Sequence, residues 1–314
     1  MSDCREFEKL SDLSQWPLII SADSKVDGAD ARRLFHGRGQ SYVGFEYLTV
    51  DYFSPVLWIV LYRDPDSAFW ADFVSALTSS LQSLCSAAIV QSRYHEGPEN
   101  YCLWGKIPES FTVQEAGLRY QVNLNASQNI GYFMDMQPTR HWLSGRVQGK
   151  RLLNLFAYTC AFSVAAEAAG ADAVVNIDMS RSALALGREN HSLNRRDDRL
   201  AETRFLPHDI LKSWGKLRKL GPFDVLICDP PSRQRGSFDA LKDYAKLVRR
   251  FVSLVSEGGD ILLCLNAPYI GESFLHELMA EHCPGAVFVT RLAGREDFPE
   301  ANIDQALKVL HYRL

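Results

Sequence analysis

An aspartate and two prolines end the apolar run FDVLICDPPS, residues 223–232. Proline has no backbone N–H and fixes φ, so Pro230 and Pro231 predict that a strand stops abruptly after Asp229. The rigid turn would hold backbone carbonyls beside the Asp229 carboxylate, which gives a set of acceptors without a proton donor. Such a turn can bind an amino or ring N–H group of a planar base and orient a weak nucleophile. We therefore expect this turn to serve the acceptor in a group-transfer reaction.

Three further apolar runs end in residues that suit a nucleotide-like ligand. Asp178 offers a carboxylate to ribose hydroxyls; a helix cap is its alternative role, but Ser180 already is a suitable N-cap. Asp209 could accept an adenine amino hydrogen while Ile210 packs on the ring, although Asp is also common in turns. The loop NLFAYTCAFS, residues 154–163, lacks the glycines of a diphosphate-binding loop and suits a compact amino-acid-like group. Together the four ends predict a cofactor that joins adenosine to an amino acid.

Apolar runs alternate with helical periods from Arg151 onward, which is typical of a parallel α/β sheet covered on both faces. Strands are predicted at 151–157, 173–179, 203–209, 223–229, 260–266, 286–292 and 307–314. Helices are predicted at 180–194, with Ser180 as N-cap, and at 238–255, with a C-cap at Gly258 and Gly259. The connection 293–306 has no helical period, so the last strand should be antiparallel. The expected fold class is α/β, a Rossmann-like seven-stranded sheet whose parallel strands bring their carboxyl ends to one edge.

The residues before this sheet have a different pattern. Strands are predicted at 47–53, 56–63, 87–94, 101–107 and 118–125, with an amphipathic helix at 66–88. We therefore predict three segments: an N-terminal extension at 1–40 without an assigned fold, a smaller α+β substrate-recognition domain at 41–145, and the cofactor domain at 146–314.

Composition places the chain among ordinary globular proteins. Its 314 residues contain no apolar stretch as long as the roughly 18 residues of a membrane span, and the charged N-terminus does not resemble a secretory signal, so a cytoplasmic location is expected. The seven cysteines form no CxxC pair and no Cys/His metal spacing. We expect reduced thiols, no disulfide and no metal.

The net charge of −4 argues against sequence-independent binding of nucleic acid. Residues 1–140 hold 11 Lys and Arg against 17 Asp and Glu, a net charge of −6, whereas residues 141–314 hold 23 against 21, a net charge of +2. Most basic residues near CDPPS should lie on solvated helix faces. Arg233 and Arg235, just past the motif with Ser232, are candidates for contacts to a polyanionic substrate.

The motifs resemble a known family. NLFAYTCAFS, VNIDMSRSALALGRENHSLN (175–194) and CDPPS (228–232) are similar to those of class I S-adenosylmethionine-dependent methyltransferases. They most resemble the bacterial 23S ribosomal RNA enzymes, which include guanine-N7 and cytosine-C5 methyltransferases. The stretch NLNASQNIGYFMDMQPTRHWL (123–143) resembles the segment that precedes the cofactor domain, so the similarity covers residues 117–314. The resemblance implies S-adenosyl-L-methionine as cofactor and ribosomal RNA as substrate.

By position, the resemblance also implies site residues. The methionine end of the cofactor would lie on Phe156, Ala157, Tyr158, Thr159 and Ala161. Asp178 would bind the ribose, Met179 and Ile210 would flank the adenine, and Asp209 would bind the adenine amino group. Asp135 and Arg140 would close over the cofactor, and Asp229 would lie next to it. The acceptor would meet Asp229, Pro230, Pro231 and Asn266 as catalytic residues and Ser232, Arg233 and Arg235 as substrate-binding residues.

Three residues depart from the family pattern. Cys160 replaces the usual glycine after Thr159 and would narrow the space for backbone approach, and Gln137 replaces a usual arginine. Ala267 stands where cytosine-C5 enzymes carry the cysteine that attacks C6 of the base. Cys264, three residues earlier, is expected to be a packed thiol, and Asn266 resembles the asparagine of the guanine-N7 type. Methylation of a base nitrogen, with guanine favoured, is therefore the main hypothesis.

Three alternatives stay open at this point, and a fourth fails. The acceptor could be cytosine C5 in RNA, or a protein or small molecule, because the acidic first part of the chain does not itself indicate RNA. The chain could also be a cofactor- and RNA-binding module with impaired catalysis, since Cys160 and Gln137 depart from the family. An NAD-dependent dehydrogenase fits the fold class but lacks the glycine fingerprint.

Overall fold

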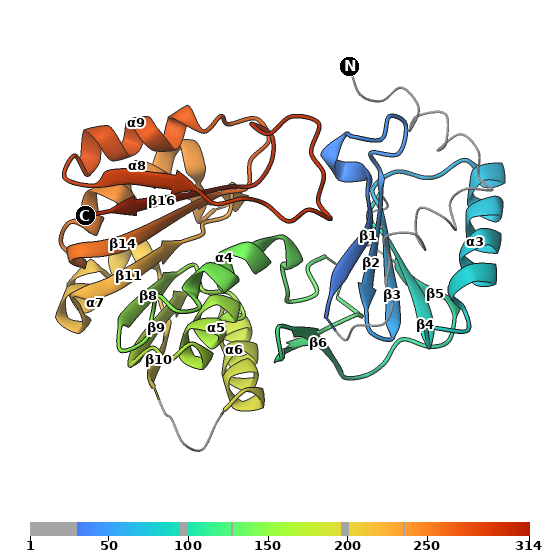
Figure 1. Cartoon of the computed structure of the whole chain (residues 1–314), viewed down its shortest axis with the longest axis horizontal. Helices are drawn as coiled ribbons and strands as arrows, with labels where there is room; N and C mark the ends of the chain where they lie inside the picture. The colour runs from blue at the N-terminus through green and yellow to red at the C-terminus, as the bar shows by residue number, and fades with distance from the viewer. Residues whose placement is uncertain (1–29, 95–98, 127, 196–200, 235) are drawn as a thin grey trace. The chain divides into compact units, whose positions relative to one another are not determined.

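The computed structural model describes residues 30–94, 99–126, 128–195, 201–234 and 236–314. The described chain forms two compact units (Figure 1). The N-terminal unit holds the described residues up to Met134 together with Arg295–Asn302, and the C-terminal unit holds Asp135–Gly294 and Ile303–Leu314. Among the helices of these ranges, none is long and apolar enough to cross a membrane.

The C-terminal unit begins earlier than the boundary predicted between residues 145 and 146. Helix α4 (Gln137–Leu143) belongs to it because Trp142 and Leu143 are buried, and the Trp142 ring meets His311 edge-on at 4.8 Å between centroids. The sequence signal of α4 is weak, since it is only two turns long and has Pro138 in its first turn.

A seven-stranded sheet forms the centre of the C-terminal unit. Its order is β10 (Glu202–Pro207), β9 (Ala173–Asp178), β8 (Arg151–Leu155), β11 (Phe223–Cys228), β14 (Val255–Leu265), β16 (Lys308–Arg313) and β15 (Val287–Arg291). The first five strands are parallel, and β16 is antiparallel to both of its neighbours. The predicted α/β class, the seven strands and the antiparallel last strand are confirmed. As expected, no helix lies between β15 and β16 among these residues.

Helices cover the two faces of this sheet (Figure 1). They are α5 (Ala161–Ala168), α6 (Arg181–Leu193), α7 (Trp214–Leu220), α8 (Ala240–Phe251) and α9 (Ser273–His282). The predicted cap of α6 is confirmed, because the Ser180 hydroxyl accepts a hydrogen bond from the Ala183 N–H at 3.1 Å. The main apolar core includes side chains of α7, α8 and α9 packed on β8, β9, β11 and β14.

The predicted glycine cap of α8 is wrong. The helix ends at Phe251 with Val252 as its C-cap, because Leu254 and Val255 are buried and already lead into β14. Gly258 lies inside β14 with φ +74°, where its N–H donates to the Leu314 carbonyl at 2.6 Å. It therefore belongs to a bulge, at which the register of β11 with β14 shifts.

The N-terminal unit is an α+β fold. Its sheet has the order β1 (Arg32–His36), β2 (Leu48–Phe53), β3 (Val56–Leu61), β4 (Ala87–Ser92) and β5 (Glu99–Trp104), with α3 (Ser67–Leu81) between β3 and β4 and a separate hairpin of β6 (Phe111–Glu115) and β7 (Leu118–Val122). The five predicted strands and the helix are present. Strands β1 and β6 are additional, and residues 1–29 lie outside the described residues.

Strand β1 depends on a segment far away in the sequence. The Arg33 N–H donates to Asp297 at 2.8 Å, and the Arg33 guanidinium lies 4.1 Å above the Phe298 ring. The same guanidinium pairs with Asp51 of β2 at 2.7 Å. The connection between β15 and β16 thus completes the N-terminal unit, which explains why β1 has no clear local pattern.

Candidate active site at the carboxyl edge of the sheet

The predicted strand ends meet at one edge of the C-terminal sheet. Leu155 of β8 pairs with Ile177 of β9 and with Cys228 of β11, and Cys228 pairs with Leu263 of β14. Neighbouring strands lie about 4.8 Å apart, so the residues that follow them are close together. The strand order reverses between β8 and β11, which is the position where open α/β sheets bind ligands.

The loop after β8 has an unusual backbone. Phe156, Tyr158 and Cys160 all adopt left-handed conformations, with φ of 59°, 47° and 64°. Each such residue costs about 1 kcal/mol or more when it is not glycine. Hydrogen bonds hold the loop: Ala157 N–H donates to the Ile177 carbonyl at 3.1 Å, and Cys160 N–H donates to the Ala157 carbonyl at 2.7 Å. Strain of this kind persists where surrounding contacts fix it, often at ligand sites.

Asp178 links this loop to α6. Its Oδ2 accepts from the Tyr158 N–H at 2.9 Å, and its Oδ1 accepts from the Ser180 N–H at 2.7 Å. Each carboxylate oxygen has a second lone pair, and the side chain is partly exposed, so Asp178 can still accept hydrogen bonds from a ligand. Met179, next in the chain, is 54% exposed. Both roles considered from the sequence are therefore compatible.

The departure at Cys160 is accommodated by a glycine in α6. A Cβ atom on Gly187 would lie 2.5 Å from the Cys160 sulfur, so the thiol occupies space that only glycine leaves free. Cys160 is fully buried, and the neighbouring Thr159 carbonyl accepts from the Asn190 side chain at 2.9 Å. The larger side chain thus packs against α6. Ala161 begins α5 immediately after this contact.

The Asp229 carboxylate lies in a site that disfavours its charge. Burial and the nearby Asp135 raise the pKa of Asp229 to about 7, and the Arg140 guanidinium opposes this shift. Arg140 itself is buried, on α4. The structure therefore brings Asp135, Arg140 and Asp229 together, although they lie almost a hundred residues apart in the sequence.

The hairpin that follows the Asp229 turn contacts the loop after β8. Pro230 is buried, and Pro231 and Ser232 are half-buried. Phe238, which begins β13 (Phe238–Asp239), meets the Phe156 ring edge-on at 5.1 Å between centroids. The loop predicted for the cofactor and the turn predicted for the acceptor thus follow two paired strand ends, and Phe238 packs on the loop.

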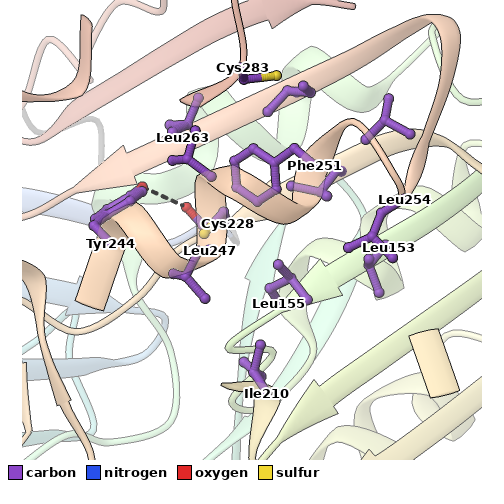
Figure 2. Packing of buried hydrophobic residues seen from close by; sticks show 14 of the residues in the cluster. Leu153, Leu155, Ile210, Cys228, Tyr244, Leu247, Phe251, Leu254, Leu263 and Cys283 are labelled. Carbon is purple, nitrogen blue, oxygen red and sulfur yellow. Dashed lines mark hydrogen bonds between the residues drawn. The ribbon is translucent and has the colours of Figure 1, made fainter. Parts of the chain in front are cut away.

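Tyr244 of α8 fixes the ends of two central strands. Its hydroxyl lies 2.9 Å from the Cys264 carbonyl of β14 and 3.5 Å from the Cys228 carbonyl of β11, and Figure 2 shows the latter contact within the apolar core. Tyr244 is fully buried. Asp229 follows β11 directly, and the exposed Asn266 follows β14 directly, so this hydroxyl supports the strand ends from which two predicted catalytic residues follow.

The remaining predicted residues lie at the margins. Asp209 caps a short helix, with Oδ1 accepting from Leu211 N–H at 2.9 Å, and Lys212 lies 3.1 Å from its Oδ2. Ile210 is buried. Arg233 is exposed in β12 (Arg233–Gln234), which pairs with β13. Arg235 lies outside the described residues.

Three residues of this site were not found from the sequence. Gly187 interrupts a good helical period, which was a usable signal of close packing. Asn190 and Tyr244 gave no signal, because their partners are backbone carbonyls of other elements.

The contact between Cys160 and Gly187 makes a testable prediction. Gly187→Ala should lower the free energy of unfolding by about 1–3 kcal/mol, because the new methyl group overlaps the thiol. Cys160→Gly should restore most of that loss in the double variant, since it removes the overlap and suits the left-handed backbone. Gly215→Ala in α7, where a Cβ meets nothing within 4 Å, is the control and should not destabilise. Urea denaturation measures the free energy of unfolding of the wild type, the two single variants, the double variant and the control. Strictly additive effects of Gly187→Ala and Cys160→Gly would contradict the proposed contact.

Comparisons with known proteins agree with this geometry. The sequence model of the S-adenosylmethionine-dependent methyltransferase family matches residues 32–313. Ribosomal RNA large subunit methyltransferase I of Escherichia coli (strain K12) is 32% identical over 252 residues, which are 76% of this chain and 61% of that protein. YwbD of Bacillus subtilis (strain 168), described as a candidate ribosomal RNA large subunit methyltransferase, is 30% identical over 253 residues, 77% of this chain and 62% of its own. The chain thus spans about three fifths of the length of these curated relatives.

Solved structures show the same architecture. SMU.776, described as a candidate methyltransferase and crystallised with SAH, superposes with a TM-score of 0.83 at 27% identity, over 96% of this chain and 82% of that one. The tRNA m1G37 methyltransferase of M. jannaschii shares the fold, with a TM-score of 0.60 at 15% identity, over 95% of this chain and 78% of that one. The match to the family model over nearly the whole described chain and the seven-stranded sheet lead to one conclusion: the chain belongs to the family of S-adenosylmethionine-dependent methyltransferases.

Proposed function

We propose that the chain is an enzyme that transfers the methyl group of S-adenosylmethionine to a base nitrogen of large-subunit ribosomal RNA, with guanine favoured. The RNA substrate is supported by the two curated relatives, which are named for this RNA. The choice of nitrogen is carried by one observation. In the described part of the C-terminal unit, every cysteine is buried, so no accessible thiol lies at the carboxyl edge of the sheet.

The residues at this edge fit the cofactor that the family uses. S-adenosylmethionine supplies an electrophilic methyl group on a sulfonium, and its adenosine part offers hydroxyl and amino donors. The proposed contacts are Phe156, Ala157, Tyr158, Thr159 and Ala161 for the methionine end, Asp178 for ribose, Met179 and Ile210 for the adenine faces, Asp209 for the amino group, and Asp135, Arg140 and Asp229 around the reacting centre. The free acceptor capacity of Asp178 supports the ribose role most directly.

Cytosine-C5 methylation needs a thiolate that attacks C6 of the base. Cys264 is fully buried, and burial, with the charges of Asp229 and Asp135 nearby, raises its pKa well above the usual value. Cys228 is also buried, and its pKa is raised for the same reason. Ala267 carries no nucleophile at the family position. A nitrogen acceptor is favoured because its own lone pair can attack the methyl group.

The Asp229 turn suits guanine as this acceptor. A carboxylate and the Pro230 carbonyl can accept from N1–H and the amino group of guanine, while the Asn266 amide can donate to a base oxygen. With N7 as the acceptor, its lone pair would form the new N–C bond, and the electron pair of the broken S–C bond would stay on sulfur. Because N7 carries no proton, no general base is required. The protein therefore contributes orientation and exclusion of water.

Arg233 supports an RNA substrate, since it is exposed immediately after the turn. Arg235 remains a proposed phosphate contact on its position in the sequence alone. An impaired binding module has less support than it had from the sequence, because Gly187 provides the space that Cys160 needs.

Asp178→Ala should weaken binding of S-adenosylhomocysteine by about 1.5–3 kcal/mol, since charge-assisted hydrogen bonds to ribose are lost. Asp172→Ala, at the opposite end of β9 and exposed, should leave the affinity unchanged. Isothermal titration calorimetry of both variants and the wild type measures this difference. Equal affinity for all three proteins would remove Asp178 from the cofactor site.

The pKa of Asp229 predicts a pH dependence. If the carboxylate must accept from the base, kcat/KM should rise with pH, reach half of its plateau near the pKa of about 7 and level off above it. Asp229→Asn should lower the rate by about 10²-fold and abolish this rise, with little change in cofactor affinity. Methyl transfer from tritiated cofactor to unmodified 23S RNA between pH 5.5 and 8.5 measures both effects. An unchanged profile in the variant would exclude Asp229 as the titrating group.

The same substitution should stabilise the protein. Burial raises the pKa of Asp229, so ionisation destabilises the folded state, and this penalty grows as pH rises from the usual pKa of 3.8 to about 7. Asp229→Asn should therefore raise the free energy of unfolding by about 1–3 kcal/mol at pH 8 and by almost nothing below pH about 4. Denaturant titrations at the two pH values test this sign, and a loss of stability at pH 8 would contradict it.

A further inference from the structure

The turn that follows β14 exposes one aromatic side chain between two buried residues. The Ala267 carbonyl accepts from the Ile270 N–H at 3.2 Å, and Pro268 occupies the second position, where proline favours a β-turn. Ala267 and Ile270 are buried, at 0% and 6% exposure, whereas Tyr269 is 68% exposed. The two ends of the turn are therefore anchored in the core, and the Tyr269 side chain is directed to solvent.

A buried lysine donates a hydrogen bond to the first residue of the same turn. Lys308 begins β16, pairs with Leu265 of β14 and is fully buried. Its ammonium lies 3.1 Å from the Ala306 carbonyl and 3.4 Å from the Ala267 carbonyl. Burial of an ammonium group is costly unless polar partners surround it. Ala267 thus receives hydrogen bonds from both the turn and the lysine, which restricts the path of the chain between Asn266 and Tyr269.

This turn lies beside the proposed acceptor turn. Cys228, the last residue of β11, pairs with Leu263, so Asp229 leaves its strand next to Cys264, two residues before Asn266. The Tyr244 hydroxyl donates to the Cys264 carbonyl and lies 3.5 Å from the Cys228 carbonyl, so it reinforces this pairing. Tyr269 is therefore an exposed aromatic residue within a few residues of Asn266, at the edge where the acceptor is proposed to bind.

Aromatic rings on rigid supports are the usual partners of unpaired nucleobases. Every base has a π-face, so stacking is favourable for any base and needs no donor or acceptor. A base must leave its stack to reach a methyl donor in a sheet-edge site, and an aromatic side chain then replaces the lost stacking. A ring on a restrained turn loses little conformational entropy when the base arrives.

We propose that Tyr269 is a stacking platform for the acceptor base, and that Lys308 is a positioning residue that holds the Ala267–Ile270 turn under it. This inference rests on the proposed function, because it assumes that an RNA base is the acceptor.

The first test is kinetic. Unmodified 23S RNA transcribed in vitro is methylated with tritiated S-adenosylmethionine, and affinity for S-adenosylhomocysteine is measured separately by calorimetry. Tyr269→Ala should raise KM for RNA by about 10- to 100-fold, with the cofactor affinity unchanged. Tyr269→Phe keeps the ring and should stay within about twofold of the wild type. Val252→Ala, 55% exposed just after the far end of α8, is the surface control.

The role of Lys308 needs a double-variant cycle. Lys308→Met should raise KM for RNA in the wild-type background while leaving cofactor affinity unchanged. If Lys308 acts through the turn, Lys308→Met should add little further increase in a Tyr269→Ala background. Full additivity of the two effects would show that the lysine does not position Tyr269.

A second measurement does not depend on turnover. The same RNA, substituted with 6-thioguanosine and irradiated in the presence of S-adenosylhomocysteine, should cross-link to a peptide that contains Tyr269. The stacking role would be overturned if Tyr269→Ala left KM for RNA unchanged and this peptide did not cross-link. The proposed function would still stand in that case, provided that the wild type transfers the tritiated methyl group to the RNA. If the protein binds S-adenosylhomocysteine but neither methylates the RNA nor cross-links to it, both the stacking role and the proposed function would be overturned.

Discussion

A single buried hydroxyl sets the geometry of the acceptor side of this site. The Tyr244 phenol donates to the Cys264 carbonyl at 2.9 Å and lies 3.5 Å from the Cys228 carbonyl, and so reinforces the pairing of the ends of β14 and β11. A buried carbonyl without a partner costs about 1–3 kcal/mol, so displacement of these strand ends from the hydroxyl would be unfavourable. Asp229 and Asn266 follow these two strands, so this contact supports the chain where both residues begin.

Stability and chemistry oppose each other in the rest of the site. Three left-handed residues in the loop after β8 and a carboxylate whose pKa is raised to about 7 by burial all weaken the folded state. Hydrogen bonds to Asp178 and the space left by Gly187 offset the strain of the loop. The charge of Asp229 has no such full compensation, because Asp135 adds to the effect of burial. Unfavourable local terms of this kind are expected at functional sites.

Much of the fold could be predicted from the sequence, because the buried parallel strands β9 and β11 have apolar runs that end at Asp178 and Asp229. The helix signal of Ser180 was equally local and equally reliable. What could not be predicted depends on partners distant in the chain. The two prominent examples are Tyr244, which binds carbonyls of two strands, and Lys308, which is charged yet fully buried in a strand of ordinary appearance.

The central claim is that the Asp229 turn presents a base nitrogen, and no cysteine, to the methyl donor. It is tested most directly by incubating unmodified 23S RNA with cofactor that carries a deuterated methyl group, digesting the RNA to nucleosides and locating the label by mass spectrometry. The account predicts the label on a nitrogen of guanosine, and the same product from the Cys264→Ala variant. Label on C5 of cytidine, lost in Cys264→Ala, would contradict it.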